Sequence, residues 1–71
     1  MPTANQKYST RVHSRRQLGR AKDHLTEVSR VLNEVGCRYA DALPQIGDGC
    51  LKCNEMVSML DALIEDIRTN I

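Results

Sequence analysis

The segment LGRAKDHLTEVSRVLNEVGCRYADA, residues 18–42, decides the fold. It places an apolar side chain at alternate steps of three and four residues, which is the spacing of one helix face in a coiled coil. The residues that keep this spacing are Leu18, Ala21, Leu25, Val28, Leu32, Val35, Tyr39 and Ala42. Gly19 and Gly36 each cost a helix about 1 kcal/mol relative to alanine, but the pattern continues past both. The segment therefore predicts one long helix, over about residues 10–43.

A second helix is predicted after a short turn. Leu43 precedes Pro44, and the residue before a proline avoids the helical region, so the first helix is expected to end there. Residues 44–49, PQIGDG, predict a turn, with Asp48 as the N-cap of the next helix. Over about residues 50–70 apolar side chains recur at helical spacing, at Cys53, Val57, Leu60, Ile64, Ile67 and Ile71. Because so short a turn makes the helices antiparallel neighbours, the expected fold is all-α, an antiparallel two-helix hairpin.

The ends of the chain carry no membrane signal. Residues 1–9 are polar, contain Pro2 and lack periodicity, so a flexible basic N-terminal arm is expected there. Uninterrupted apolar runs are three residues or shorter, whereas a signal peptide or a membrane span needs a much longer one. We therefore expect a cytoplasmic protein that does not interact with a membrane.

The predicted second helix has more apolar side chains than one neighbouring helix can cover, because two helices touch along one line only. A chain of 71 residues without tryptophan or phenylalanine also has little material for a core of its own. We therefore expect a homo-oligomer, a four-helix bundle or a higher assembly. Its interface is predicted to contain Met56, Met59, Leu60, Leu63 and Ile67. Alternatively, the stripe of Met56, Met59 and Leu63 docks a different protein, which would make the chain an inhibitor or adaptor.

The net charge of +1 conceals an uneven distribution. Residues 1–22 contain six basic side chains and no acidic one, whereas residues 23–71 contain four basic and nine acidic side chains. This asymmetry is typical of a segment that binds an anionic partner, and it predicts a nucleic acid or a nucleotide. A small regulator from a phage or mobile element would fit this size and charge. The candidate residues are Lys7, Tyr8, Arg11, Arg15, Arg16, Arg20 and Lys22, with Tyr8 placed to stack on a base.

A second interpretation of these cations needs no ligand. Arg11 and Arg15 are expected near the carboxyl end of the second helix. Glu65, Asp66 and the terminal carboxylate are available there as ion-pair partners. In that case the basic segment would only neutralise the acidic one.

The cysteines and histidines do not predict an enzyme. Cys50 and Cys53 form a CxxC pair, which is found in zinc half-sites and in redox proteins. Because zinc needs four ligands, such a site would have to be shared between two chains, and Cys53 is more simply a small apolar side chain. His13 and His24 lack the spacing of a metal pair and the partners of a catalytic triad. We therefore expect neither catalysis nor a metal or other cofactor.

Overall fold

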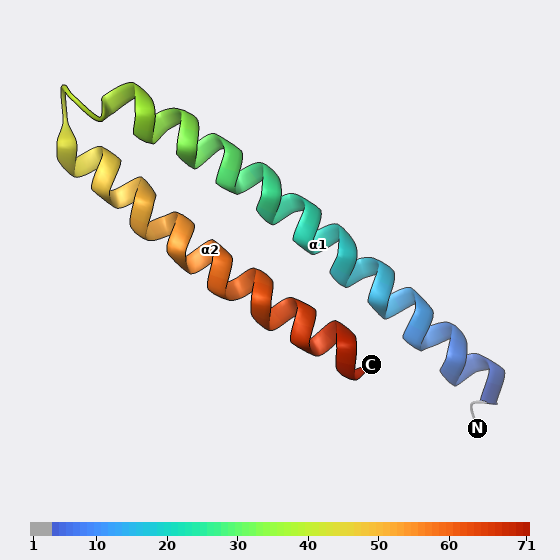
Figure 1. Ribbon diagram of the computed structural model, residues 1–71. Coiled ribbons are helices and arrows are strands. Elements are labelled where there is room, and N and C mark those ends of the chain that lie inside the picture. The colour runs from blue at the N-terminus through green and yellow to red at the C-terminus, as the bar shows by residue number, and fades with distance from the viewer. Residues whose placement is uncertain (1–3) are drawn as a thin grey trace.

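The structure is a computed structural model, which describes the backbone of residues 4–71 and the side chains of residues 10–71. Within this range the chain forms two α-helices, α1 (Ala4–Tyr39) and α2 (Pro44–Asn70), and no strand. The helices lie side by side and antiparallel (Figure 1), in a molecule that measures 60 × 15 × 15 Å. The predicted all-α fold with two packed helices is confirmed.

The turn lies at residues 40–43, whereas the sequence predicted it at residues 44–49. Leu43 has φ −138° and ψ 80°, as expected before a proline. Pro44 then begins α2, because the first position of a helix tolerates a residue without an N–H group. The backbone N–H of Leu43 donates to the carbonyl of Tyr39, and that of Ile46 donates to the carbonyl of Leu43, both at 2.9 Å. These two bonds close the turn, and no described residue has a positive φ. Gly47 and Gly49, which the sequence placed in the turn, lie inside α2 instead.

The first helix begins at Ala4, earlier than the predicted start near residue 10. Residues 4–9 are therefore helical in place of the expected arm, and residues 1–3 lie outside the described part. At its other end α1 stops at Tyr39, so Ala42 belongs to the turn and not to the helix contact.

The line of contact between the helices is more polar than the sequence pattern suggested. On α1 the predicted residues Leu18, Leu25, Leu32 and Val35 are half-buried. On α2 the half-buried residues keep a regular spacing of three and four: Gly47, Cys50, Asn54, Val57, Asp61, Ile64, Arg68 and Ile71. Only Val57, Ile64 and Ile71 of these were predicted; Cys53, Leu60 and Ile67 are exposed instead. The contact line of α2 is thus rotated away from its most apolar stripe.

Polar side chains bridge the helices along this line. The Nδ2 group of Asn54 donates to Oδ1 of Asn33 at 2.7 Å, and Nζ of Lys22 donates to Oε2 of Glu65 at 2.6 Å. Oδ1 of Asn54 is buried without a hydrogen-bond partner among the described residues. A polar residue in such a contact line fixes register at some cost in stability.

Small residues of the two helices face each other near the turn. A Cβ atom added to Gly36 would lie 3.2 Å from Cβ of Cys50. One added to Gly47 would lie 3.5 Å from the carbonyl oxygen of Gly36. The absence of a side chain at these two positions therefore permits the close approach.

The paired residues define the register of the hairpin. Lys22 lies against Glu65, Asn33 against Asn54 and Gly36 against Cys50. Continuing at 1.5 Å per residue, α2 ends opposite about residue 16 of α1. Residues 4–15 of α1 extend beyond it (Figure 1). At the helical rise of 1.5 Å per residue, this extension is about 18 Å long. We call this segment the overhang.

Candidate anion-binding end and apolar interface

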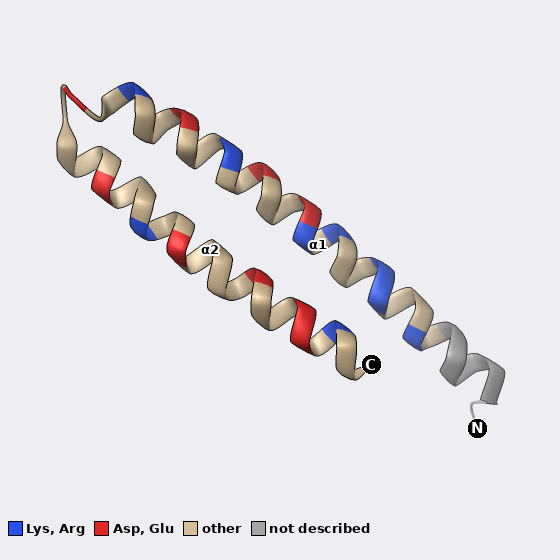
Figure 2. Ribbon diagram, in the orientation of Figure 1, with Lys and Arg blue, Asp and Glu red and all other residues tan. Residues whose placement is uncertain are grey.

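The cations of α1 gather at the overhang and at the adjoining end of the hairpin. Arg11, Arg15, Arg16 and Arg20 are all exposed, and we call these four residues the basic end. In Figure 2 the charged residues at this end of α1 are all basic (blue), and the first acidic residues (red) lie further toward the turn. The side chains of the remaining two candidates, Lys7 and Tyr8, lie outside those that the structure describes.

Lys22 differs from the basic end because its ammonium group forms ion pairs within the hairpin. Its ammonium lies 2.6 Å from Oε2 of Glu65 and 3.9 Å from Oδ2 of Asp61. Arg68 adds a second cation to Glu65, at 3.6 Å. The hydrogen bond and charge of Lys22, with the charge of Arg68, hold the pKa of Glu65 below its ordinary value of 4.5.

Within the part of the chain whose side chains are described, the basic end has no such partner. Among residues 10–71, no carboxylate forms an ion pair with any of the four arginines. Glu65, which the sequence offered as a partner for Arg11 and Arg15, is occupied by Lys22 and Arg68. The internal-neutralisation interpretation therefore applies to Lys22 and is not seen for the basic end.

A shallow depression of about 460 Å³ lies where α2 ends against α1. Its lining residues are Arg16, Gly19, Arg20, Lys22, Asp23 and Arg68. A Cβ on Gly19 would stand 3.8 Å from Nη2 of Arg68, in ordinary van der Waals contact. The depression brings four cations and one carboxylate together.

Arg68 was missed by the sequence interpretation. It lies near the opposite end of the chain from the other cations, and only the helix register brings it beside them. The antiparallel topology predicted from the sequence placed the end of the second helix near Arg11 and Arg15. To place Arg68 beside the other cations, one must also know which residues of the two helices lie opposite each other, and the sequence pattern did not show this.

All five predicted interface residues are exposed. Met56 and Met59 are 69% and 68% exposed, and Leu63 is 60% exposed. Leu60 and Ile67 are also exposed. Four of these residues, together with Val57, line a shallow depression of about 340 Å³: Met56, Met59, Leu60 and Leu63.

Two valines of α1 extend this surface across the hairpin. At 100° per residue, Val28 lies about 120° from Lys22 around α1, and Leu60 lies about 120° from Asn54 around α2. Lys22 and Asn54 both make polar contacts between the helices, so the apolar residues of both helices lie on the opposite side. We call this surface the apolar face: Val28, Val31, Met56, Met59, Leu60, Leu63 and Ile67.

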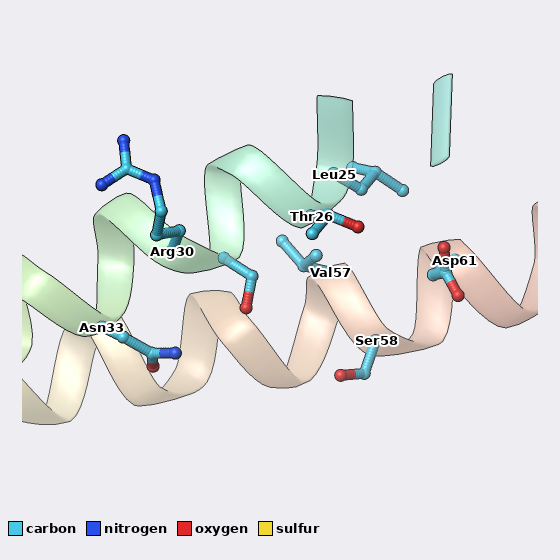
Figure 3. A pocket seen from close by; sticks show the side chains of 8 residues that line it. Leu25, Thr26, Arg30, Asn33, Val57, Ser58 and Asp61 are labelled. Carbon is cyan, nitrogen blue, oxygen red and sulfur yellow. The ribbon is translucent and has the colours of Figure 1, made fainter. Parts of the chain in front are cut away.

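The other side of the hairpin is a polar groove of about 500 Å³. Figure 3 shows Thr26 and Asn33 of α1 on one wall and Ser58 and Asp61 of α2 on the other. We call it the polar side. Arg30 lies at its edge and forms ion pairs with Glu27 and Glu34 on its own helix.

The three cysteines are free thiols near the turn. Cys37 and Cys53 are exposed and Cys50 is half-buried. Within the described residues no group of three or more His, Cys, Asp or Glu side chains could hold a metal ion. A zinc site at Cys50 and Cys53 would thus still require ligands from a second chain.

Neither described helix is long and apolar enough to cross a membrane. Comparisons with protein-family models, with curated proteins and with solved structures find no match to this chain.

Proposed function

We propose that this chain is a non-enzymatic, self-associating binding protein whose basic end engages the phosphate groups of a nucleic acid or a nucleotide. One observation carries the proposal. Arg11, Arg15, Arg16 and Arg20 are exposed together and lack a carboxylate partner among residues 10–71. Unpaired arginines are the side chains best suited to phosphate, since the guanidinium group can donate two parallel hydrogen bonds.

The shape of the molecule supports this assignment. Arg11 and Arg15 lie on the overhang, where α1 has no neighbouring helix within the chain. A phosphate backbone can therefore approach that part of α1 from several sides. The basic depression next to it, with Arg68 contributed by α2, adds a place where one phosphate meets cations of both helices.

Binding of this kind depends on salt. Each phosphate contact releases counterions, so the affinity for duplex DNA falls with a logarithmic slope of about −0.9 per contact. A nucleotide makes few contacts and gives a shallow slope, whereas a nucleic acid that follows the basic end gives a steep one. The slope therefore distinguishes the two ligands.

The test is fluorescence anisotropy with labelled single-stranded RNA, duplex DNA and ATP, from 50 to 300 mM salt. Arg11→Gln with Arg15→Gln removes two charges from the overhang. Arg38→Gln with Lys52→Gln removes two exposed charges near the turn and is the matched control. We expect the first pair to weaken binding at least tenfold and to reduce the salt slope by one to two, while the control changes affinity less than twofold.

Equal losses from both pairs would mean that net charge alone attracts the ligand. No binding of any of the three probes at 50 mM salt would contradict the proposal. Binding of ATP by the native protein, without binding of RNA or DNA, would assign the site to nucleotides.

A further inference from the structure

We infer that a second copy of this chain covers the apolar face, in a two-fold dimer whose basic ends point in opposite directions. The inference deepens the proposed function and rests on it for the role of the basic ends. The dimer itself is argued from the surface of the hairpin, independently of any ligand.

The exposed area of the chain is larger than a compact monomer of its size should have. The chain exposes 5722 Å², whereas a compact monomer of 8.0 kDa is expected to expose about 4,450 Å². The excess of about 1,300 Å² is larger than the roughly 800 Å² that each partner contributes to a standard interface. Some of it lies on the overhang. No described residue of the hairpin is buried, however, so the excess also reflects a missing core.

The chemistry of the apolar face also favours a second copy. Its seven side chains come from both helices, and each is at least 43% exposed. Soluble chains seldom leave a large group of apolar side chains open on one side. Two copies stacked through it would give a four-helix bundle, and the polar side of each hairpin would remain outside. The same surface on both partners is what two-fold symmetry requires.

Charge selects the orientation of the two copies. If both turns lay at one end, the two basic ends would stand about 15 Å apart, because neighbouring helices pack 8–10 Å apart. Eight unpaired arginines would then repel one another over one to two Debye lengths. With the turns at opposite ends, the midpoint of the apolar face, near residue 28, lies on the two-fold axis. The basic ends are then about 40 Å apart, where salt screens them.

This orientation has a consequence for binding. Each dimer presents one basic end at each pole, so it can hold two short ligands or bridge two stretches of one long nucleic acid. A long strand should then bind more tightly than a short one through effective concentration alone.

The orientation is tested with spin labels. His13 is exposed on the overhang and outside the basic end, so a His13→Cys label, with the native cysteines replaced, reports the separation of the overhangs. Pulsed dipolar spectroscopy without ligand should give a distance near 45 Å. A distance below about 20 Å would overturn the opposed orientation, and no dipolar coupling in a chain of monomer mass would overturn the dimer.

The native thiols give a second test that needs no substitution. Cys53 lies one turn before Met56 on the apolar face, whereas Cys37 borders a depression on the polar side with Asn33 and Asn54. Under reducing conditions, Cys53 alkylation should slow at least fivefold between 1 and 500 μM protein, while Cys37 alkylation stays constant. Equal rates at all concentrations would overturn the inference.

The dimer and phosphate binding by the basic end can be tested independently of each other. Arg11→Gln with Arg15→Gln should leave the spin-label distance and the thiol protection unchanged. Loss of phosphate binding with an intact dimer would therefore concern the basic end alone. A monomer that still binds nucleic acid would overturn the dimer and leave the proposed function standing.

Discussion

The two sides of the hairpin differ in the contacts that their side chains make within the chain. On the polar side, Asn33 bonds to Asn54 and Lys22 bonds to Glu65, so the groups that link the helices find partners within the chain. On the opposite side, Met56, Met59 and the other apolar residues remain exposed. One side completes the fold of the monomer. The other has no partner within the described chain.

The difference explains why the hairpin can have a defined register although none of its described residues is buried. Polar pairs and the close contact of Gly36 with Cys50 fix how the helices are aligned. These contacts supply little of the free energy of folding, because exposed polar pairs contribute little. The greater part must come from apolar burial, and the apolar face is the surface still available for it.

The largest effect is expected from changes to the apolar face. Replacing Met56, Met59 and Leu63 with glutamine removes the burial of six large side chains from a two-fold dimer, each worth about 1.5–3 kcal/mol when fully buried. We expect the dissociation constant of the dimer to rise at least 100-fold and the helical circular dichroism signal to fall at micromolar concentration. Leu51→Gln, at a residue that is 60% exposed on α2 beside the polar side, is the control and should change neither.

The triple variant also distinguishes self-association through Met56, Met59 and Leu63 from docking of a different protein on them. If the triple variant kept the mass of the native protein in solution, the stripe would not be the self-association surface. A role in docking a different protein would then be the better explanation.

The next largest effect is expected at the tight contact between Gly36 and Cys50. Gly36→Leu forces a side chain against Cβ of Cys50 and should reduce the free energy of unfolding by about 1–3 kcal/mol, measured by urea titration. Gly49 has nothing within 4 Å of an added Cβ, so Gly49→Leu should raise stability by up to about 1 kcal/mol through helix propensity. Equal effects at the two glycines would show that the close contact does not hold the hairpin together.

A smaller effect is expected from the polar pair in the contact line. Asn33→Ala leaves Asn54 without its hydrogen-bond partner and should cost about 1 kcal/mol. Replacing both asparagines with leucine should recover stability, because an apolar pair fills the same place without unpaired groups. A double-mutant cycle in urea measures the coupling. Strictly additive changes would mean that the two amides act independently.

The smallest effect is the pH dependence from Glu65. Its pKa is lowered in the folded hairpin by the hydrogen bond from Lys22, so its ionised form stabilises the fold. That contribution is complete above the ordinary pKa of 4.5 and is lost as the pH falls through the lower, folded-state value. The urea midpoint should therefore decrease below pH 4.5, and Glu65→Gln should show a shallower decrease. An identical pH profile for the variant would contradict the assignment.

Part of this structure could be predicted from the sequence. Leu18, Leu25 and Leu32 are strong signals at regular spacing, and they lie in the helix contact as predicted. The position of the turn was not predictable from Pro44 alone, because proline both ends one helix and begins another. From the sequence, Pro44 was expected to end the first helix and to begin a turn. In the structure it begins α2.

The contact line of α2 was harder to predict for a different reason. Apolar periodicity finds the most hydrophobic stripe of a helix, which on α2 contains Leu60 and Ile67. The structure uses a neighbouring stripe that includes Asn54 and Asp61, whose polarity hides it from such a pattern. Met56, Met59 and Leu63 were chosen as surplus apolar side chains beside the predicted contact line, and they are exposed. Leu60 and Ile67 were also expected in the helix contact, but they are exposed as well. What covers them depends on a second molecule.

The most direct test of the central claim is the mass of the unmodified protein in solution, measured by sedimentation equilibrium without ligand from 5 to 500 μM. Association through the apolar face predicts a mass that approaches twice the 8.0 kDa of the chain as concentration rises. A mass of 8.0 kDa over the whole range, with the helical signal intact, would show that the hairpin is stable alone and would contradict the account.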